Sequence, residues 1–200
     1  MYKVVFRVDG GFSIGMGHIM RCISVAKDIM ITTGGSDSYD ISSKIINMIL
    51  EDEELKKVKL NVIVGKGFTN KESLGEIAKE NKNIILYENT KYMSEIMLKA
   101  DIVIAAGGST LYELCACGTT TIRFIVADNQ SELVEKMNAL GYIISLGWYD
   151  EFSKEDVMYN LKNLCNDYLI RVKLSEYMQT LLDGKGTIRI VEEILSIYIV

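Results

Sequence analysis

The sequence contains no proline, one histidine and one tryptophan among its 200 residues. The absence of proline indicates a coding bias rather than a structural class. No apolar run reaches the length of a membrane span, and the N-terminus lacks the pattern of a signal peptide. A formal net charge of −5 argues against general nucleic-acid binding, so any phosphate site has to be local. We therefore expect a cytoplasmic protein that binds neither membranes nor nucleic acids.

The cysteine pattern argues against a zinc site. The four cysteines are Cys22, Cys115, Cys117 and Cys165, and neither a second close pair nor a histidine cluster accompanies Cys115 and Cys117. Because these two lie two residues apart on an expected helix, their side chains point in different directions. We expect buried, reduced thiols, and neither a bound metal nor a cofactor.

The sequence does have the composition of a soluble globular domain. Hydrophobic residues make up 48% of it and charged residues 24%, which is ordinary for such proteins. A length of 200 residues suggests one domain, or one domain and a fragment of another. A chain of this size can bury roughly 70% of its unfolded surface, so a substantial core is expected.

A glycine turn between an apolar strand and a helix is the most informative stretch. Ile102–Ala106 is a short apolar run of the kind found in parallel strands covered on both faces. Gly107-Gly108 ends it, and neither residue has a side chain to block a ligand. Ser109 or Thr110 then supplies a helix N-cap, with Glu113 at or near the N3 position of a capping box. The first N–H groups of that helix would point to a bound phosphate, although a tight turn without a ligand fits the same residues.

The rest of the chain alternates between strands and helices. The expected strands are 29–33, 60–64, 84–87, 102–106, 120–124 and 142–146, and the expected helices are 41–50, 71–81, 92–99 and 129–140, with two or three more between 154 and 200. This alternation predicts an α/β fold with a doubly wound parallel sheet and right-handed crossovers. Such sheets bind ligands at the carboxyl ends of their strands, where the loops 34–37, 107–110 and 128–130 fall.

A second glycine-rich unit at the N-terminus ends abruptly. Residues 2–8 are expected to form a strand, 9–17 a loop and 19–27 a helix, which together are the first unit of a nucleotide-binding Rossmann-type half. His18 stands at the N-terminus of that helix, where a capping or solvent-facing role is commoner than catalysis. Helix-to-strand connections usually need a turn of about two to six residues, often with glycine, but no such turn lies between Ala26 and Ile29. We expect a helix that is cut short and joined to a different unit.

Six motifs occur along the chain in a fixed order. They are Arg7-x-Asp9, Ile14-Gly15-Met16-Gly17-His18, Arg21-Cys22, Gly34-Gly35-Ser36-Asp37, Gly107-Gly108-Ser109-Thr110-Leu111-Tyr112-Glu113 and Ala127-Asp128-Asn129-Gln130. This set resembles the UDP-2,4-diacetamido-2,4,6-trideoxy-β-L-altropyranose hydrolase family of pseudaminic acid biosynthesis, whose members are often labelled spore coat polysaccharide biosynthesis proteins. Gly118-Thr119 departs from the Gly-Val-Pro that is usual in the family.

The resemblance implies a GT-B architecture, in which two Rossmann-like domains face each other across the active site. It implies that residues 1–27 are a short strand–helix remnant of the N-terminal domain and that residues 28–200 are the C-terminal, nucleotide-sugar-binding domain. Most of the first domain would then be missing, at the place where the turn after Ala26 is missing.

The resemblance also implies roles for individual residues. Glu113 would bind the ribose hydroxyls, and Asn129 and Gln130 would read the sugar. His18 would be the catalytic base that activates water for attack at the anomeric carbon. The implied substrate-binding residues are Arg7, Asp9, Gly15, Gly17, Arg21, Gly35, Ser36, Gly107, Gly108, Ser109, Thr110, Glu113, Asn129 and Gln130.

The implied function is hydrolysis of a UDP-linked diacetamido-trideoxy sugar with release of UDP, in pseudaminic acid or spore-coat-type polysaccharide biosynthesis. Two alternatives stay open. A GT-B glycosyltransferase would use the same second domain with an acceptor in place of water, and a remnant would bind the UDP-sugar without turnover. Gly17-His18 together with Arg21 favours the hydrolase.

We expect weak or absent hydrolysis by this chain, even though it contains His18. A general base must lie within about 2.6–3.2 Å of the proton it takes, or one water away. One strand and one short helix in residues 1–27 are too little to hold that geometry alone. The measurement is UDP release from a UDP-amino sugar, compared with the His18→Ala variant. Robust turnover that disappears on substitution would contradict this expectation.

Overall fold

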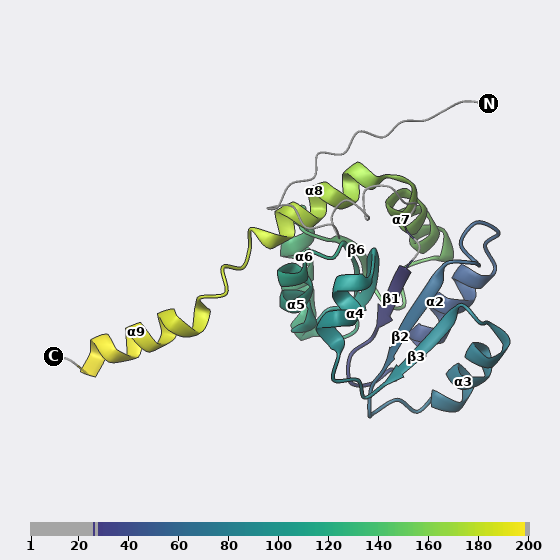
Figure 1. The fold of residues 1–200 in the computed structure, drawn as a ribbon, viewed down its shortest axis with the longest axis horizontal. Helices are drawn as coiled ribbons and strands as arrows, with labels where there is room; N and C mark the ends of the chain where they lie inside the picture. The colour runs from purple at the N-terminus through teal and green to yellow at the C-terminus, as the bar shows by residue number, and fades with distance from the viewer. Residues whose placement is uncertain (1–25, 27, 199–200) are drawn as a thin grey trace.

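The computed structural model describes Ala26 and residues 28–198, which form a sheet of six strands flanked by helices (Figure 1). The strands are β1 (Asp28–Thr32), β2 (Lys59–Val64), β3 (Ile84–Glu88), β4 (Ile102–Ala106), β5 (Thr121–Ile125) and β6 (Ile144–Trp148). Their order across the sheet is β3-β2-β1-β4-β5-β6, and each neighbouring pair is parallel. The predicted α/β fold with a parallel, doubly wound sheet is therefore confirmed. Six predicted site residues lie outside the described residues: Arg7, Asp9, Gly15, Gly17, His18 and Arg21.

Helices cover both faces of the sheet. They are α2 (Ile41–Leu50), α3 (Lys71–Glu80), α4 (Met93–Lys99), α5 (Thr110–Cys117), α6 (Asp128–Ala139), α7 (Lys154–Asn166), α8 (Tyr168–Gln179) and α9 (Gly186–Tyr198). Helices α2, α3 and α7 bury their apolar side chains in a core on one face, and α4, α5 and α6 in a second core on the other. Helix α8 packs against both α5 and α7.

The central strands are buried on both sides, which explains their uninterrupted apolar runs. All five residues of β4 and all five of β5 are buried, whereas the edge strand β6 is half-exposed along its length. Fully burying one such aliphatic side chain contributes about 1.5–3 kcal/mol. The centre of the sheet therefore fixes where the loops at its carboxyl edge begin.

The predicted strand limits differ most from the structure at β6. Gly141 takes a left-handed φ of 77°, and the turn that it makes delays the start of the strand to Ile144. A second left-handed glycine, Gly147 at φ 78°, accompanies a shift in the pairing of β6 with β5. Because that irregularity lets pairing resume, the strand continues to Trp148, two residues beyond its predicted end.

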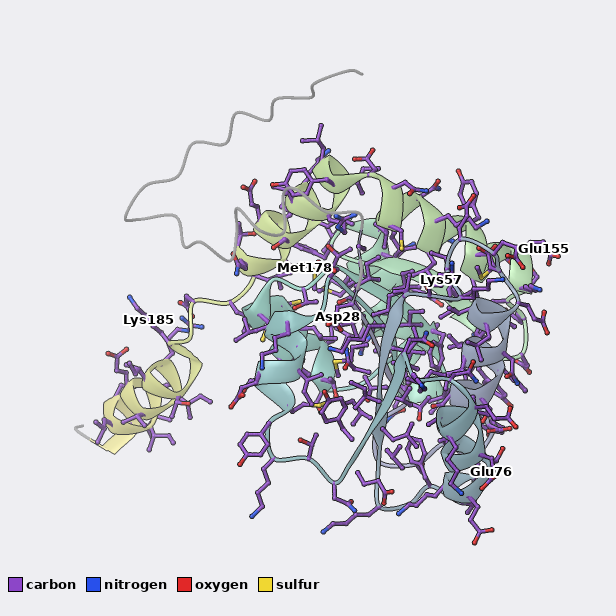
Figure 2. All side chains as sticks on the ribbon, turned by 45° about the vertical axis from the view of Figure 1, so that its right-hand side comes forward. Asp28, Lys57, Glu76, Glu155, Met178 and Lys185 are labelled. Atoms are coloured by element: carbon purple, nitrogen blue, oxygen red, sulfur yellow. The ribbon has the colours of Figure 1, made fainter. Side chains whose placement is uncertain are left out.

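Helix α9 stands apart from the body of the molecule, beyond Lys185 (Figure 1, Figure 2). Its exposed apolar side chains are Ile188, Ile190, Val191, Ile194, Leu195 and Ile197. They share one side of the helix, as the 3.6-residue period requires of an amphipathic helix. With 13 residues α9 is shorter than a bilayer, and within residues 28–198 no helix combines the length and the apolar character needed to span one.

The order of the strands places a crevice at one edge of the sheet. The chain leaves β1 towards β2 and β3, and it returns to β4 on the opposite side of β1. The loops after β1 and β4 therefore run in opposite directions from two adjacent strands. This reversal is the point where parallel sheets bind their ligands.

One carboxylate fixes the loop after β1. Asp37 is 4% exposed, and its Oδ1 accepts a hydrogen bond from the Ile41 N–H (2.9 Å) while its Oδ2 accepts one from the Ser42 N–H (3.0 Å). These are the first N–H groups of α2. The side chain of Asn70 donates a further bond to Oδ2 at 3.2 Å. The charge of Asp37 is therefore engaged by the N-terminus of α2.

We predict that Asp37→Ala lowers the free energy of unfolding by about 1–2 kcal/mol, because two helix N–H groups lose their acceptor. Urea unfolding measures the change. Glu135→Ala is the matched control, since Glu135 is an exposed carboxylate in the middle of α6, and its effect should stay below about 0.5 kcal/mol. Equal stability of the two variants would show that Asp37 does not cap α2.

Candidate functional site

A cavity of about 520 Å³ opens at the carboxyl ends of β1, β4 and β5. Its lining residues are Thr32, Thr33, Gly34, Gly35, Ser36, Asp37, Ser38, Tyr39, Ile41, Ala106, Gly107, Gly108, Ser109, Thr110, Val126, Ala127 and Gln130. They belong to the loop after β1, the turn from β4 into α5 and the turn from β5 into α6. The volume is in the range of small-molecule sites.

The loop after β1 is shaped by close contact between backbones. The Gly67 N–H donates to the Gly35 carbonyl (2.9 Å), and the Thr33 hydroxyl donates to the Ser36 carbonyl (3.1 Å). A Cβ atom on Gly65 would lie 2.5 Å from the Gly35 oxygen, so only glycine fits there. Gly34 takes a left-handed φ of 96°. The loop thus presents main chain, rather than large side chains, to the cavity.

The turn after β4 offers N–H groups to the same cavity. The Gly107 N–H donates to the Phe124 carbonyl (2.7 Å), which ties the turn to β5. Ser109 and Thr110 follow at the N-terminus of α5, and their N–H groups make no hydrogen bond to the described residues. The first N–H groups of a helix lack partners within it, so they are available to an anion.

The predicted capping box at this helix is wrong. Ser109 occupies the N-cap position, but its φ of −57° and ψ of −26° are helical, and its side chain makes no capping bond. A capping side chain needs extended backbone angles at its own residue to reach the N–H groups that follow. Instead, the Leu111 N–H donates to the Gly108 carbonyl and the Tyr112 N–H to the Ser109 carbonyl, each at 3.0 Å.

The third segment is held by Gln130. Its Oε1 accepts a hydrogen bond from the Val126 N–H (3.1 Å), and its amide nitrogen makes no hydrogen bond to the described residues. That nitrogen is a donor for a ligand. Helix α6 begins at Asp128 with Ala127 as its N-cap, so Asn129 lies inside the first turn of the helix.

Most of the predicted binding residues that the structure describes line one cavity. Seven of them line it: Gly35, Ser36, Gly107, Gly108, Ser109, Thr110 and Gln130. Two do not, because Glu113 and Asn129 are exposed on the surfaces of α5 and α6 and lie outside the lining. Their proposed contacts with ribose and sugar would require a ligand that extends out of the cavity along those helices.

An aromatic pair at the cavity was not predicted from the sequence. Tyr39, in the lining, stacks on Tyr149 with ring centroids 3.9 Å apart and planes 21° from parallel. The interaction with the Tyr39 hydroxyl raises the pKa of Tyr149, so the Tyr149 phenol is neutral at physiological pH. No sequence signal joins two tyrosines that are so far apart along the chain.

The described lining holds no lysine, arginine or histidine, and Asp37 is its one charged side chain. That carboxylate is engaged by α2. An anion would therefore be attracted by backbone N–H groups and by the N-termini of α5 and α6. Within residues 28–198 no group of three or more histidine, cysteine, aspartate or glutamate side chains is arranged to hold a metal ion.

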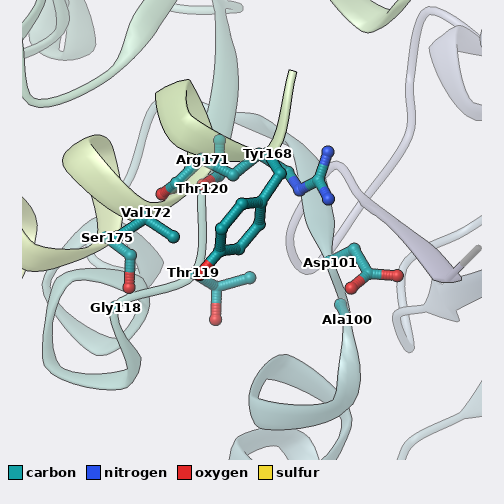
Figure 3. Close-up of a pocket in the computed structure, with 9 residues that line it drawn as sticks. All are labelled: Ala100, Asp101, Gly118, Thr119, Thr120, Tyr168, Arg171, Val172 and Ser175. Carbon is teal, nitrogen blue, oxygen red and sulfur yellow. Dashed lines mark hydrogen bonds between the residues drawn. The ribbon is translucent and has the colours of Figure 1, made fainter. Parts of the chain in front are cut away.

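A smaller cavity of about 30 Å³ lies at the opposite edge of the sheet, beside the amino ends of β4 and β5 (Figure 3). Polar groups around it make hydrogen bonds within the protein. The Arg171 guanidinium donates to the carbonyls of Leu164 and Cys165 at the end of α7, and it lies 5.9 Å from the ring of Tyr168. The Thr120 hydroxyl donates to the Arg171 carbonyl at 3.2 Å. These groups connect α8 to α7 and to the sheet, which is a structural role. The larger cavity is therefore the candidate site.

Comparison with known sequences finds a matching family and a similar protein. Residues 29–145 match the family described as glycosyltransferase family 28 C-terminal domain. The spore coat polysaccharide biosynthesis protein SpsG of Bacillus subtilis is 23% identical over 172 residues, which are 86% of this chain and 51% of SpsG. The chain thus spans about half the length of that relative.

Solved structures share the fold at low sequence identity. MurG of Acinetobacter baumannii superposes with a TM-score of 0.72 and 14% identity over 90% of this chain and 53% of MurG. TarM of S. aureus, in complex with fondaparinux, α-GlcNAc-glycerol and UDP, gives 0.60 and 14% over 86% of this chain and 35% of TarM. The fold is that of the C-terminal domain of GT-B glycosyltransferases.

We predict that Gly107→Ala destabilises the protein by about 1–3 kcal/mol, as overpacking does. The added Cβ would lie 2.7 Å from Val134 Cγ2 and 3.0 Å from Gln130 Oε1. Gly108→Ala is the matched control, because a Cβ there meets nothing within 4 Å, and its effect should be small. Thermal unfolding compares the two. A Gly107→Ala variant as stable as Gly108→Ala would contradict the close contact between the turn and α6.

Proposed function

Because the chain belongs to the glycosyltransferase family 28 C-terminal domain family, we propose that its cavity binds a nucleoside diphosphate sugar of the UDP class. The observation that carries this proposal is the convergence of backbone N–H groups at the switch point of the sheet. Ser109 and Thr110 supply them from one side, and the Gly34–Ser36 loop faces them from the other. With the one charged side chain of the described lining already engaged, these donors favour a diphosphate.

The remaining parts of the ligand would occupy the rim. The free amide nitrogen of Gln130 would donate to a sugar hydroxyl or N-acetyl oxygen. The exposed ring of Tyr39 offers an apolar face beside the polar loops. Glu113 would bind the ribose only if the nucleoside lies along α5, outside the lining.

Glycosyl transfer is the reaction class that the family match supports best. The SpsG relative suggests that the product belongs to a spore-coat-type polysaccharide. Hydrolysis of a UDP-linked diacetamido-trideoxy sugar in pseudaminic acid biosynthesis is the second candidate, because Gly17-His18 and Arg21 resemble the hydrolase motif. Both reactions would use the same diphosphate site and differ in whether an acceptor or water attacks the sugar.

We predict that UDP raises the thermal midpoint of the protein and that ADP does so much less. A ligand at 100 times its dissociation constant stabilises the native state by about 2.7 kcal/mol. For a chain of this length each kcal/mol moves the midpoint by roughly 2–4 °C. Differential scanning fluorimetry with millimolar UDP, ADP and uridine measures the shifts. The absence of any shift with UDP would refute the proposal.

The same titration separates the nucleoside contact from the phosphate contact. Glu113→Ala should weaken UDP binding by about 1.5–3 kcal/mol if the carboxylate binds the ribose hydroxyls. Glu135→Ala removes an exposed carboxylate of α6 in the same way and should leave binding unchanged. UDP affinity that is equal in the two variants would leave the diphosphate site intact and reject the ribose role of Glu113.

A further inference from the structure

A charged side chain is buried directly behind the cavity. Arg123 lies in the middle of β5, paired with Ala105 of β4 and with Ser145 of β6, and its side chain is 0% exposed. Arginine is almost never fully buried unless its charge is paired. The lone cation in this otherwise uncharged strand therefore requires an explanation.

The guanidinium makes one hydrogen bond to the described residues, and its acceptor lies in the lining of the cavity. Its Nη2 donates to the carbonyl of Gly108, in the lining, at 3.1 Å. Its Nε and Nη1 are buried without a hydrogen-bond partner in the part of the chain that the structure describes. A guanidinium has five N–H donors, so most of its capacity is unused.

The charge of Arg123 is retained, and no anion among the residues that the structure describes balances it. Burial lowers the pKa of Arg123 to about 10, so the side chain remains protonated at neutral pH. Burial also raises the pKa of the nearby Cys115 thiol to about 11, which keeps that thiol neutral. The described surroundings thus hold a full positive charge in a region of low dielectric.

The bond to Gly108 also orients the turn. In a trans peptide the carbonyl of one residue and the N–H of the next point in opposite directions. Because Arg123 draws the Gly108 carbonyl towards itself, the Ser109 N–H points away from the guanidinium. That N–H is one of the two donors at the start of α5 that make no bond to the described residues.

We propose that Arg123 is the buried counter-charge for phosphate groups bound at the Gly107–Thr110 turn, acting on them through the Gly108–Ser109 peptide. This inference rests on the proposed function, because it presupposes an anionic ligand in the cavity. It makes Arg123 a positioning residue that does not touch the ligand. An anion bound at the turn supplies the negative counter-charge that the buried guanidinium lacks. The buried charge therefore favours binding of the anion, and the bound anion lowers the free-energy cost of burying Arg123.

The proposal predicts opposite effects on stability and on binding. Replacing a buried, poorly paired charge by an apolar side chain of similar volume is often neutral or stabilising. Arg123→Met should therefore leave the thermal midpoint of the unliganded protein unchanged or raise it. The same variant should bind UDP at least about tenfold more weakly, and its loss for UMP, which carries less charge, should be smaller.

Two further variants complete the experiment. Arg123→Lys keeps the charge and should retain UDP affinity within a few-fold of the unmodified protein. Lys136→Met removes one positive charge from an exposed position on α6 and controls for net charge. Isothermal titration calorimetry with UDP and UMP gives the affinities, and thermal unfolding without ligand gives the midpoints.

Each outcome decides the matter. Weaker binding of UDP by Arg123→Met, with a reduced preference for UDP over UMP and no loss of midpoint, would support the counter-charge. Unchanged UDP affinity would overturn it and leave the proposed function standing. Three other results would also overturn the counter-charge proposal and leave the proposed function standing. They are an equal loss of affinity for UDP and UMP in Arg123→Met, a loss of UDP affinity in Arg123→Lys as large as that in Arg123→Met, and a thermal midpoint of Arg123→Met lowered by more than a few degrees. An unmodified protein that is folded but does not bind UDP would overturn both proposals.

Discussion

The pairing of β1 with β4 is the interaction on which the rest of the site depends. The two strands run in register from Ile29 with Ile102 to Thr32 with Ala105, so their carboxyl ends lie level. Beyond those ends the chain turns to opposite sides, and a cavity is left between the two loops. Burial on both faces fixes the register, since a slip of one residue would turn every side chain to the other core. The cavity is therefore a consequence of strand order, and no single side chain creates it.

Close backbone contacts convert this crevice into a surface of main-chain donors. Gly65 lets the loop of Gly35 lie against it, and Gly107 lets Gln130 and α6 approach the turn after β4. Larger side chains at either position would push the loops apart or fill the space. With Asp37 engaged by α2, the positive potential of the cavity comes from helix N-termini in its lining and from Arg123 behind it.

The limits of helices and strands could be predicted where hydrophobic periodicity and turn residues agree. α2 and β4 have their predicted limits, because each apolar pattern is bounded by residues that break it. The loops at 34–37 and 107–110 could be placed because parallel sheets gather the carboxyl ends of their strands at one edge. Contacts between distant segments could not be predicted. The stacking of Tyr39 on Tyr149 depends on such a contact. Arg123 is visible in the sequence as a lone charge between apolar residues, but its partner, the Gly108 carbonyl, follows only from the pairing of β4 with β5.

Stability and binding draw on different parts of this molecule. The two cores hold the sheet, and the apolar side chains of β1 and β4 would be nearly as well buried with any ligand or with none. Arg123 differs, because burying a guanidinium with unused donors costs free energy on folding. A negative charge nearby reduces that cost. The buried charge lowers the stability of the unliganded protein, and its attraction to a bound anion offsets that cost in the complex. Natural sequences violate the usual rules of burial and charge pairing mainly at functional sites. The arginine in the middle of a buried strand is such a violation, and it lies directly behind the turn where the sheet leaves room for an anion.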